Sequence, residues 1–381
     1  MRIPVAKPYL TEEDAKNAYE TILSGWVTQG PKVQEFEEKF AEYVGAEYAV
    51  AVSNGTAALH LSLEAAGIKA GDEVICPSLS FIATANAISY TGAKPVFAEI
   101  DPETYNLDAA HTEALIGEKT RAILIVHQMG FPADIDAFQQ LCRRHGLTLI
   151  EDAACAAGSS YKGKKIGSHS GLVCFSFHPR KVITTGDGGM ITTSDESYYK
   201  RLRLLRQHGM SVNDRERHSA SKVILEEYLE LGYNYRLTDI QAAIGIRQLE
   251  KLEWLVSERR KIAEKYDQKL REIEGIRIPT EREGYSSNYQ SYSICLEGGL
   301  QPYRNTIMQK LLDSGIATRR GIMTIHREGI YRDDTGATRL PVSESISDSS
   351  IILPLFVPME DSEIEYVAEQ LKGILTMMDG R

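Results

Sequence analysis

Hydrophobic and polar residues recur along this chain with two periods, and each period predicts a different kind of element. Apolar residues at helical spacing predict two amphipathic helices near the start, over 12–24 and 33–44. In the second segment Val33, Phe36, Phe40 and Tyr43 fall on one face. From residue 48 onward, short apolar segments alternate with helical ones. We expect strands at 48–52, 73–76, 95–100, 121–127, 147–151, 172–177 and 190–193, and helices at 56–66, 81–90, 135–145 and 198–208.

Several of the predicted strands are unbroken apolar runs, such as AILIV and VCFSF. Strands buried on both faces have this pattern, whereas a strand with one wet face alternates. Together with the intervening helices, the runs predict an α/β fold whose mostly parallel sheet has helices on both faces.

The last third of the chain has a different pattern. A long stretch with few helix breakers, 237–274, predicts a helix that connects two parts of the protein. A strand at 291–296 and helices at 303–314 and 363–376 then suit a compact α+β unit. We therefore expect a large domain over 1–245, including the N-terminal helical segment, and a small C-terminal domain over 246–381 with the connecting helix.

Composition narrows the classes of protein. The net charge of −10 disfavours nucleic acid as a partner. The sequence has no apolar run of membrane-spanning length and no signal-peptide pattern at its start, so we expect a cytoplasmic protein. The five cysteines lie in apolar surroundings without metal-ligand spacing, which predicts reduced thiols and no metal site.

Three loops that follow predicted strands carry the chemistry. In the first, SNGTAAL, a strand ends at Ser53 and a helix begins at Thr56 or Ala57. Backbone N–H groups at a helix N-terminus bind phosphate, although Asn54 or Thr56 could equally be an ordinary N-cap.

The second loop, EDAACAAG, places Glu151 and Asp152 at the end of an apolar strand. A carboxylate there can accept a charge-assisted hydrogen bond from a protonated heterocycle, or it can cap a helix.

The third loop, SFHPRKVITTGDGG, offers the hydroxyl of Ser176 and the amine of Lys181. Its glycines 186, 188 and 189 allow the backbone to approach a ligand closely. A lysine in such a cleft is a candidate for a Schiff base, and a surface lysine on a hairpin is the plain alternative.

Taken together, the loops supply an amine, an acid and a phosphate site, which pyridoxal 5′-phosphate (PLP) requires. Asp152 would keep the pyridine nitrogen protonated, and Lys181 would act as the proton-transferring base. Phe81 could stack on the ring, or be a core residue at the start of a helix.

With these segments, the chain resembles the DegT family of PLP-dependent nucleotide-sugar aminotransferases, which have fold type I. The resemblance covers nearly the whole chain, and it is specific because many segments occur in the same order. They are SGWVTQGPKVQEFEEKFAEYVG, SNGTAAL, EDAACAAG, SFHPRKVITTGDGG, GYNYRLTDIQAAIG, TIHREGIY and ILPLF.

The resemblance implies a role for each matching residue. Lys181 bonds covalently to PLP, Asp152 contacts the pyridine nitrogen, and Phe81 stacks on the ring. Thr56 and Ala57 bind the phosphate through backbone amides, and Ser176 binds it through its hydroxyl. Asn234 reaches the phosphate from a partner subunit, which implies a homodimer with shared active sites. The residues expected near the sugar-nucleotide are His326, Trp26, Thr28 and Gln29.

Two positions depart from the family pattern. Cys155 stands where many relatives have Gln, and Ala157 stands where they have His. A thiol is a poorer hydrogen-bond donor than an amide, so the contact of Cys155 with the ring hydroxyl of PLP is weakened.

The sequence predicts transfer of an amino group, from glutamate, to a keto group of a nucleotide-linked deoxysugar. Arg236, Arg319 and Arg320 are candidate cations for the carboxylates and the pyrophosphate. Lys181 favours transamination, because family members with His at this position are dehydratases. A keto-sugar without a nucleotide, another PLP reaction and a non-catalytic regulator remain alternatives. The chain lacks the GxxxxGK[ST] and GxGxxG motifs of ATPases and dinucleotide enzymes.

Overall fold

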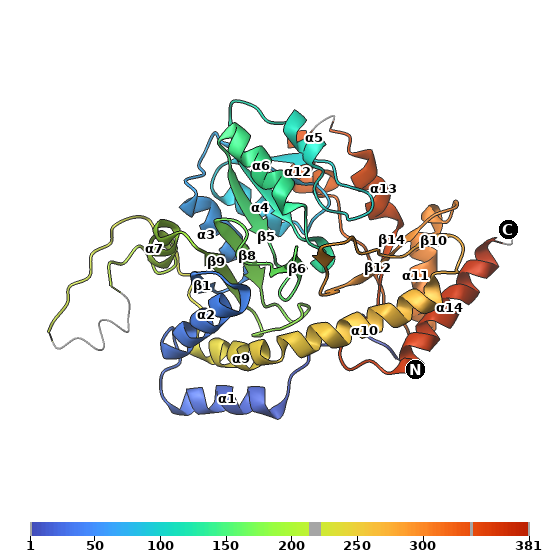
Figure 1. Ribbon diagram of the computed structural model, residues 1–381, viewed down its shortest axis with the longest axis horizontal. Coiled ribbons are helices and arrows are strands. Elements are labelled where there is room, and N and C mark those ends of the chain that lie inside the picture. Colours follow the sequence, from blue (N-terminus) through green and yellow to red (C-terminus); the bar gives the residue numbers. More distant parts are fainter. Residues whose placement is uncertain (1, 213–221, 336–337, 380–381) are drawn as a thin grey trace.

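The computed structural model describes residues 2–212, 222–335 and 338–379 (Figure 1). Its centre is a seven-stranded sheet with the strand order β1-β9-β8-β5-β4-β2-β3. The strands are β1 (Tyr48–Val52), β2 (Glu73–Pro77), β3 (Lys94–Ala98), β4 (Thr120–Val126), β5 (Thr148–Asp152), β8 (Leu172–Ser176) and β9 (Gly189–Thr193).

The sheet is mostly parallel, which confirms the predicted fold class. The four pairings β2–β3, β2–β4, β4–β5 and β5–β8 are parallel, whereas β9 runs antiparallel to both of its neighbours, β8 and β1. The carboxyl ends of all strands except β9 therefore lie at one edge of the sheet.

Each strand contributes alternate side chains to two separate apolar cores. In β8, Val173 and Phe175 belong to one core, and Leu172 and Cys174 belong to the other. This division explains the unbroken apolar runs, because every side chain of such a strand is buried. The first face is covered by α2 (Pro31–Val44), α6 (Ile135–His145) and α9 (Asp239–Glu250), and the second by α3 (Gly55–Ala65), α4 (Ala83–Tyr90) and α7 (Glu196–Leu205).

A four-stranded antiparallel sheet, in the order β10-β12-β14-β13, forms the C-terminal part. Its strands are β10 (Ile276–Arg277), β12 (Tyr292–Leu296), β13 (Arg319–Arg320) and β14 (Ser350–Leu353). The helices of this part are α11 (Arg304–Asp313), α12 (Gly329–Thr335), α13 (Pro341–Ser349) and α14 (Asp361–Asp379), with the short 3-10 turns η2 (Gln301–Tyr303) and η3 (Ile325–Arg327).

The remaining elements are short or peripheral. A three-stranded sheet of β11 (Tyr285–Ser286), β6 (Ser160–Tyr161) and β7 (Lys164–Lys165) joins the two parts. The others are α1 (Glu12–Leu23), α5 (Ala109–Ala114) and the 3-10 turn η1 (Gln128–Gly130).

The single connecting helix expected over 237–274 is wrong, because the stretch forms two helices. α9 ends at Glu250, and α10 (Leu252–Leu270) follows after Lys251, whose φ of −95° and ψ of −9° interrupt the helical geometry. The Lys251 ammonium contacts Asp14 (2.7 Å) and Thr11 (2.8 Å) at the start of α1, and the local pattern of the stretch does not reveal this tertiary contact.

The two helices still connect the parts of the protein, and α10 runs from below the seven-stranded sheet to the C-terminal part (Figure 1). The domain boundary at residue 245 stays a prediction, and that residue lies inside α9.

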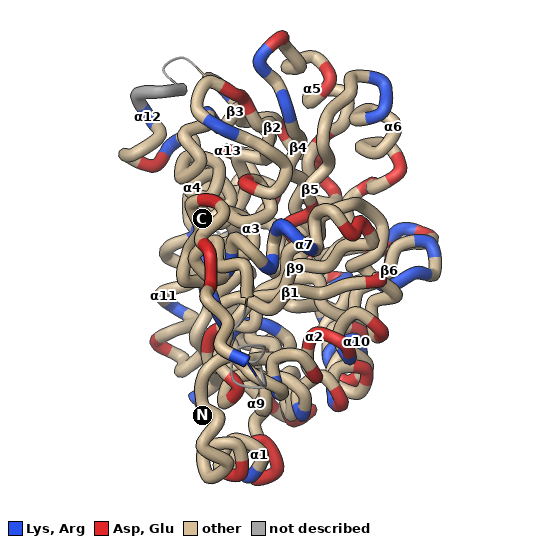
Figure 2. Tube along the Cα trace, turned by 90° about the vertical axis from the view of Figure 1, so that its left-hand side faces the viewer, with Lys and Arg blue, Asp and Glu red and all other residues tan. Residues whose placement is uncertain are grey.

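Acidic and basic residues are interspersed along most elements (Figure 2). Within the described residues, no helix combines the length and the apolar character needed to cross a membrane.

Candidate active site

A cavity of about 730 Å³ opens at the carboxyl ends of the sheet strands. It is lined by residues that follow β1, β2, β4, β5 and β8, and on the opposite side by residues near β12, β13 and β14. Among the predicted site residues, those that line it are Thr56, Ala57, Phe81, Asp152, Cys155, Ser176, Lys181 and Arg319. The three loops chosen from the sequence therefore meet at one place.

Asp152 is the acid of this cavity, and it is 6% exposed. Its carboxylate accepts hydrogen bonds from the Ala154 N–H and the Thr84 hydroxyl, each at 3.1 Å. Burial raises the pKa of Asp152, while the Ala154 amide, the Lys181 charge and the Thr84 hydroxyl act in the opposite direction. A cationic group placed against Asp152 would complete the stabilisation of its ionised form.

Glu151 belongs to a different environment, because successive side chains of a strand point to opposite faces. Its carboxylate contacts His127 Nε2 at 2.9 Å, and both side chains are fully buried. His127 Nδ1 also accepts the backbone N–H of Ala133 (3.0 Å). The backbone N–H of His127 donates to the carbonyl of Asp152 (3.0 Å). Of the two carboxylates in the EDAACAAG segment, only Asp152 lines the cavity.

Lys181 lies in the loop between β8 and β9, with its ammonium 3.2 Å from the Cys155 thiol. The backbone N–H of Lys181 donates to the His178 carbonyl (2.8 Å) and closes a turn. The Lys181 side chain lines the cavity. Position 189 has no room for a side chain, since a Cβ there would lie 2.4 Å from the Asn54 carbonyl oxygen. This close approach brings the lysine loop against the start of α3.

The N-terminus of α3 and Ser176 form one concave surface. Asn54 is the N-cap, and its side chain accepts the Ala57 N–H at 2.8 Å. The N–H groups of Gly55 and Thr56 have no hydrogen bond to another described residue. A Cβ at Gly55 would lie 2.8 Å from Ser176 Cβ, so glycine lets the helix end approach that serine. An anion at this point would meet free amides, a hydroxyl and the positive end of a helix dipole.

The sequence predicted that the Ala57 amide binds phosphate. In the structure this amide already donates to the Asn54 side chain. The two open amides, of Gly55 and Thr56, lie one position earlier. The structure shows the Asn54 cap, and beside it two amides that remain open to a ligand.

Phe81 is 60% exposed and lines the cavity, so it is not a core residue at the start of a helix. The helix begins two residues later, at Ala83. An exposed ring on a cavity wall is available for stacking on a planar ligand.

The other predicted residues lie outside this cavity in the chain itself: Trp26, Thr28, Gln29, Asn234, Arg236 and His326. Asp239 holds the segment that carries the first three, because its carboxylate accepts the N–H groups of Gly30, Lys32 and Val33 at 2.7 to 3.0 Å. Asn234 is exposed, and its backbone pairs with Gln207.

Two cationic side chains of the predicted set, Arg319 and Arg320, are exposed on the wall opposite Lys181. Arg320 approaches Glu328 at 3.8 Å. Arg180, which was not predicted, lines the same cavity.

Sequence reasoning also missed Gln128 and Met129, which follow β4, and Thr84, which bonds Asp152. The strand-end rule that selected the three loops applies equally to HQMG after β4 and could have found the first two. Val5, Gln290 and Ser291 carry no local signal, because only the tertiary fold brings them to the cavity.

The arrangement fits PLP. The cavity combines a lysine amine, a buried acid, an open helix N-terminus with a serine hydroxyl, and an exposed aromatic ring. Its volume of about 730 Å³ lies within the range of about 300–1,000 Å³ for small-molecule sites. No cluster of three or more potential metal ligands occurs among residues 2–212, 222–335 and 338–379.

Comparison with known proteins gives consistent matches over nearly the whole chain. The model of the DegT/DnrJ/EryC1/StrS aminotransferase family matches residues 8–372. GDP-perosamine synthase of Caulobacter vibrioides is 39% identical over 377 residues, which is 98% of each chain.

Solved structures agree with this match. The DesV structure of S. venezuelae, in complex with a ketimine intermediate, has a TM-score of 0.91 at 32% identity and covers 98% of both chains. A sugar aminotransferase described as putative, Spr1654 of Streptococcus pneumoniae, was solved in PLP and PMP forms. These have TM-scores of 0.91 and 0.92 at 28% identity; both cover 98% of this chain, and 98% and 99% of the Spr1654 chains respectively.

Proposed function

This chain belongs to the DegT/DnrJ/EryC1/StrS aminotransferase family, and from that premise we propose that it transfers an amino group from L-glutamate to a keto group of a nucleotide-linked deoxysugar. It is a PLP-dependent sugar aminotransferase. The product would enter the biosynthesis of a polysaccharide or another glycoconjugate.

One observation carries the proposal: Lys181 and Asp152 line the same cavity, beside the open N-terminus of α3. When bound there, PLP withdraws electrons from the carbon that carries the amino group. The Asp152 carboxylate would hold a proton on the pyridine nitrogen. Lys181 Nζ would take a proton from the α-carbon of glutamate and, in the second half-reaction, return one to the sugar carbon that gains the amine.

The remaining cofactor contacts follow from the cavity lining. The Gly55 and Thr56 amides and the Ser176 hydroxyl would hold the phosphate, and Phe81 would stack on the ring. Cys155 lies beside Lys181 Nζ, so its thiol would face the lysine end of the cofactor.

Arg319 and Arg320 would bind the substrate anions, because they place two cations on the wall opposite the lysine. Trp26, Thr28, Gln29 and His326 were expected near the sugar-nucleotide. In this chain alone none of the four lines the cavity, so their roles depend on the partner or on indirect effects.

A homodimer is part of the proposal. The segment 222–232 carries the exposed side chains of Val223, Leu225 and Leu231, which are 91%, 85% and 84% exposed. Large apolar side chains exposed to this degree favour burial against a second copy. Asn234 follows this segment and would then reach the phosphate of the partner's site.

The test uses the purified holoprotein with ¹⁵N-labelled L-glutamate. Glutamate alone should yield one 2-oxoglutarate per active site and convert the cofactor to its amine form. Addition of a GDP-linked keto-sugar, chosen because of the similarity to GDP-perosamine synthase, should yield a ¹⁵N-amino sugar still linked to the nucleotide. UDP- and dTDP-linked keto-sugars form the comparison set.

Each alternative has its own outcome in this test. Label transfer to a free keto-sugar alone would replace the nucleotide-linked substrate. Loss of water from the sugar without label transfer would indicate a dehydratase. If neither glutamate nor any other amino donor converts the cofactor to its amine form, the proposal is contradicted and a non-catalytic regulator is favoured.

A further inference from the structure

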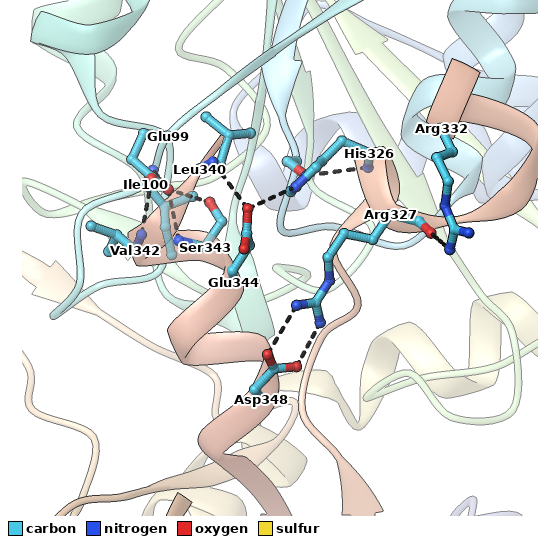
Figure 3. Close-up of polar contacts among 11 residues, drawn as sticks. Glu99, Ile100, His326, Arg327, Arg332, Leu340, Val342, Ser343, Glu344 and Asp348 are labelled. Carbon is cyan, nitrogen blue, oxygen red and sulfur yellow. Dashed lines mark hydrogen bonds and ion pairs between the residues drawn. The ribbon is translucent and has the colours of Figure 1, made fainter. Parts of the chain in front are cut away.

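A polar cluster joins the segment after β2 to η3 and α13, which come more than two hundred residues later in the sequence, and Figure 3 shows its contact between His326 and Glu344. Ser78 follows β2, His326 lies in η3, and Glu344 lies in α13. The Ser78 hydroxyl is 2.5 Å from His326 Nδ1, and His326 Nε2 is 3.2 Å from the Glu344 carboxylate. The His326 side chain is 4% exposed, and none of the three residues lines the cavity.

The hydrogen bonds have a consistent direction. The Ser78 hydroxyl oxygen accepts the backbone N–H of His326 at 3.4 Å, which leaves its own hydrogen to donate to Nδ1. His326 Nε2–H then donates to Glu344, which also accepts the Leu340 N–H at 3.2 Å. Both ring nitrogens of the imidazole therefore contact protein groups, one in the segment after β2 and one in α13.

α13, which carries Glu344, is fixed to the edge of the seven-stranded sheet. Glu99, the residue after β3, accepts the backbone N–H groups of Val342 (3.0 Å) and Ser343 (2.7 Å) at the first turn of α13 (Figure 3). Further along the same helix, Asp348 pairs with both terminal nitrogens of Arg327, at 2.9 and 2.5 Å. The helix thus holds η3 at two successive residues.

A short backbone ladder continues the connection. The Ile325 N–H donates to the Ser78 carbonyl (2.8 Å), and Leu79 forms an antiparallel bridge with Thr324. On one side of this ladder the chain continues to Phe81. This residue lies on the wall of the cavity that carries Lys181 and Asp152, which we call the cofactor wall. On the other side the chain leads back to Arg319, on the opposite wall.

We propose that His326 is a positioning residue that fixes these two walls relative to one another, instead of the substrate contact that the family resemblance implies. The inference rests on the proposed function for the identity of the ligands. Its basis is geometric: the Ser78–His326 contact joins the two segments that lead to Phe81 and Arg319, and the His326–Glu344 contact fixes the imidazole to α13. Loss of Ser78 or His326 removes the side-chain contact between the two segments, and loss of Glu344 removes the hydrogen bond that orients the His326 ring in that contact.

The test compares Ser78→Ala, His326→Gln and Glu344→Gln with the matched control His145→Gln. His145 also pairs with a glutamate, Glu113 at 3.5 Å, but on the surface away from the cavity. The first readout is the dissociation constant of PLP, obtained by titration of the apoprotein, which needs no sugar substrate. The second is KM and kcat for the keto-sugar, and the third is the melting temperature.

All three cluster variants should weaken PLP binding and raise KM by a similar factor, about three- to tenfold, as expected for one lost hydrogen bond. The double variant Ser78→Ala/His326→Gln should be no weaker than the poorer single variant, because both changes break one joint. His145→Gln should match the wild type.

The inference is overturned if His326→Gln alone raises KM while Ser78→Ala and Glu344→Gln match the wild type, since His326 would then contact the substrate. Wild-type constants in all variants would equally overturn it. If a variant melts early, the mildest change, Glu344→Gln, decides the matter. Failure of the proposed function would appear as an inactive wild type, with the PLP titrations still interpretable.

Discussion

The two walls of the cavity are built in different ways. The cofactor wall consists of short loops that directly follow buried strands of one sheet, and its acid, Asp152, is 6% exposed. The opposite wall is assembled from residues near 5, 290, 320 and 352, and its cations Arg319 and Arg320 are exposed. The first wall can hold reacting groups at fixed positions, while the second can change with the substrate at little cost to the fold.

The electrostatics of the walls differ in the same sense. Water screens the exposed arginines, so each contributes a modest amount to binding and little to stability. The buried carboxylate of Asp152 is screened far less, so its charge affects the stability of the folded protein and, in the proposed function, would also act on the cofactor.

The largest expected effect tests the cofactor wall. Asp152→Asn should lower kcat/KM about 100- to 1,000-fold, the range for removal of one preorganised electrostatic group. Burial raises the pKa of Asp152, so ionisation costs folding free energy above the unfolded pKa of about 4. The cofactor-free variant should therefore melt at the same or a higher temperature than the wild type at pH 7, and this gain should vanish as the pH falls toward about 4.

Asp195→Asn is the control for the direction of this change in melting temperature. Asp195 caps α7 at the surface, and hydrogen bonds from Ser197 lower its pKa. Its ionised form therefore stabilises the fold, and the variant should show no gain at pH 7. Calorimetry of both variants across this pH range, without cofactor, makes the comparison. A large drop in the melting temperature of Asp152→Asn at pH 7 would contradict the assigned environment.

An intermediate effect tests the opposite wall. Arg319→Ala should raise KM for the keto-sugar nucleotide about tenfold with kcat nearly unchanged, because a charge-assisted contact is lost in the ground state and the transition state alike. Arg144→Ala, on the outer surface beside Glu113, is the control. A fall in kcat with constant KM would instead place Arg319 among the reacting groups.

The smallest effect concerns the ring on the cofactor wall. Phe81→Ala should weaken PLP binding about two- to tenfold, as expected for one stacking contact. Tyr303→Ala, which removes another exposed aromatic ring that does not line the cavity, should bind PLP like the wild type. Equal constants for Phe81→Ala and the wild type would remove Phe81 from the cofactor site.

The difference between the walls also explains how much the sequence could predict. Strand ends and helix starts are local features, so Asp152, Lys181, Ser176 and Thr56 were found from single loops and do meet in one cavity. Gln290 and Val5 reach the cavity only through tertiary packing, and no local pattern marks them.

The fold has the same division. Unbroken apolar runs predicted the central sheet correctly, because burial on both faces is visible in each strand. The break at Lys251 depends on a contact with Asp14 in α1, more than two hundred residues earlier, so helical periodicity alone predicted one helix where there are two.

The central claim is that Lys181 forms the covalent bond to PLP in this cavity, and one measurement tests it directly. The holoprotein is reduced with borohydride, digested and mapped by mass spectrometry, with Lys181→Ala in parallel. We expect a phosphopyridoxyl group on Lys181 in the wild type. In the variant we expect no such group at the site, together with a loss of activity of at least about 10,000-fold, the upper end for a proton-transferring group. A label on another lysine in the wild type, or full activity in Lys181→Ala, would contradict the claim.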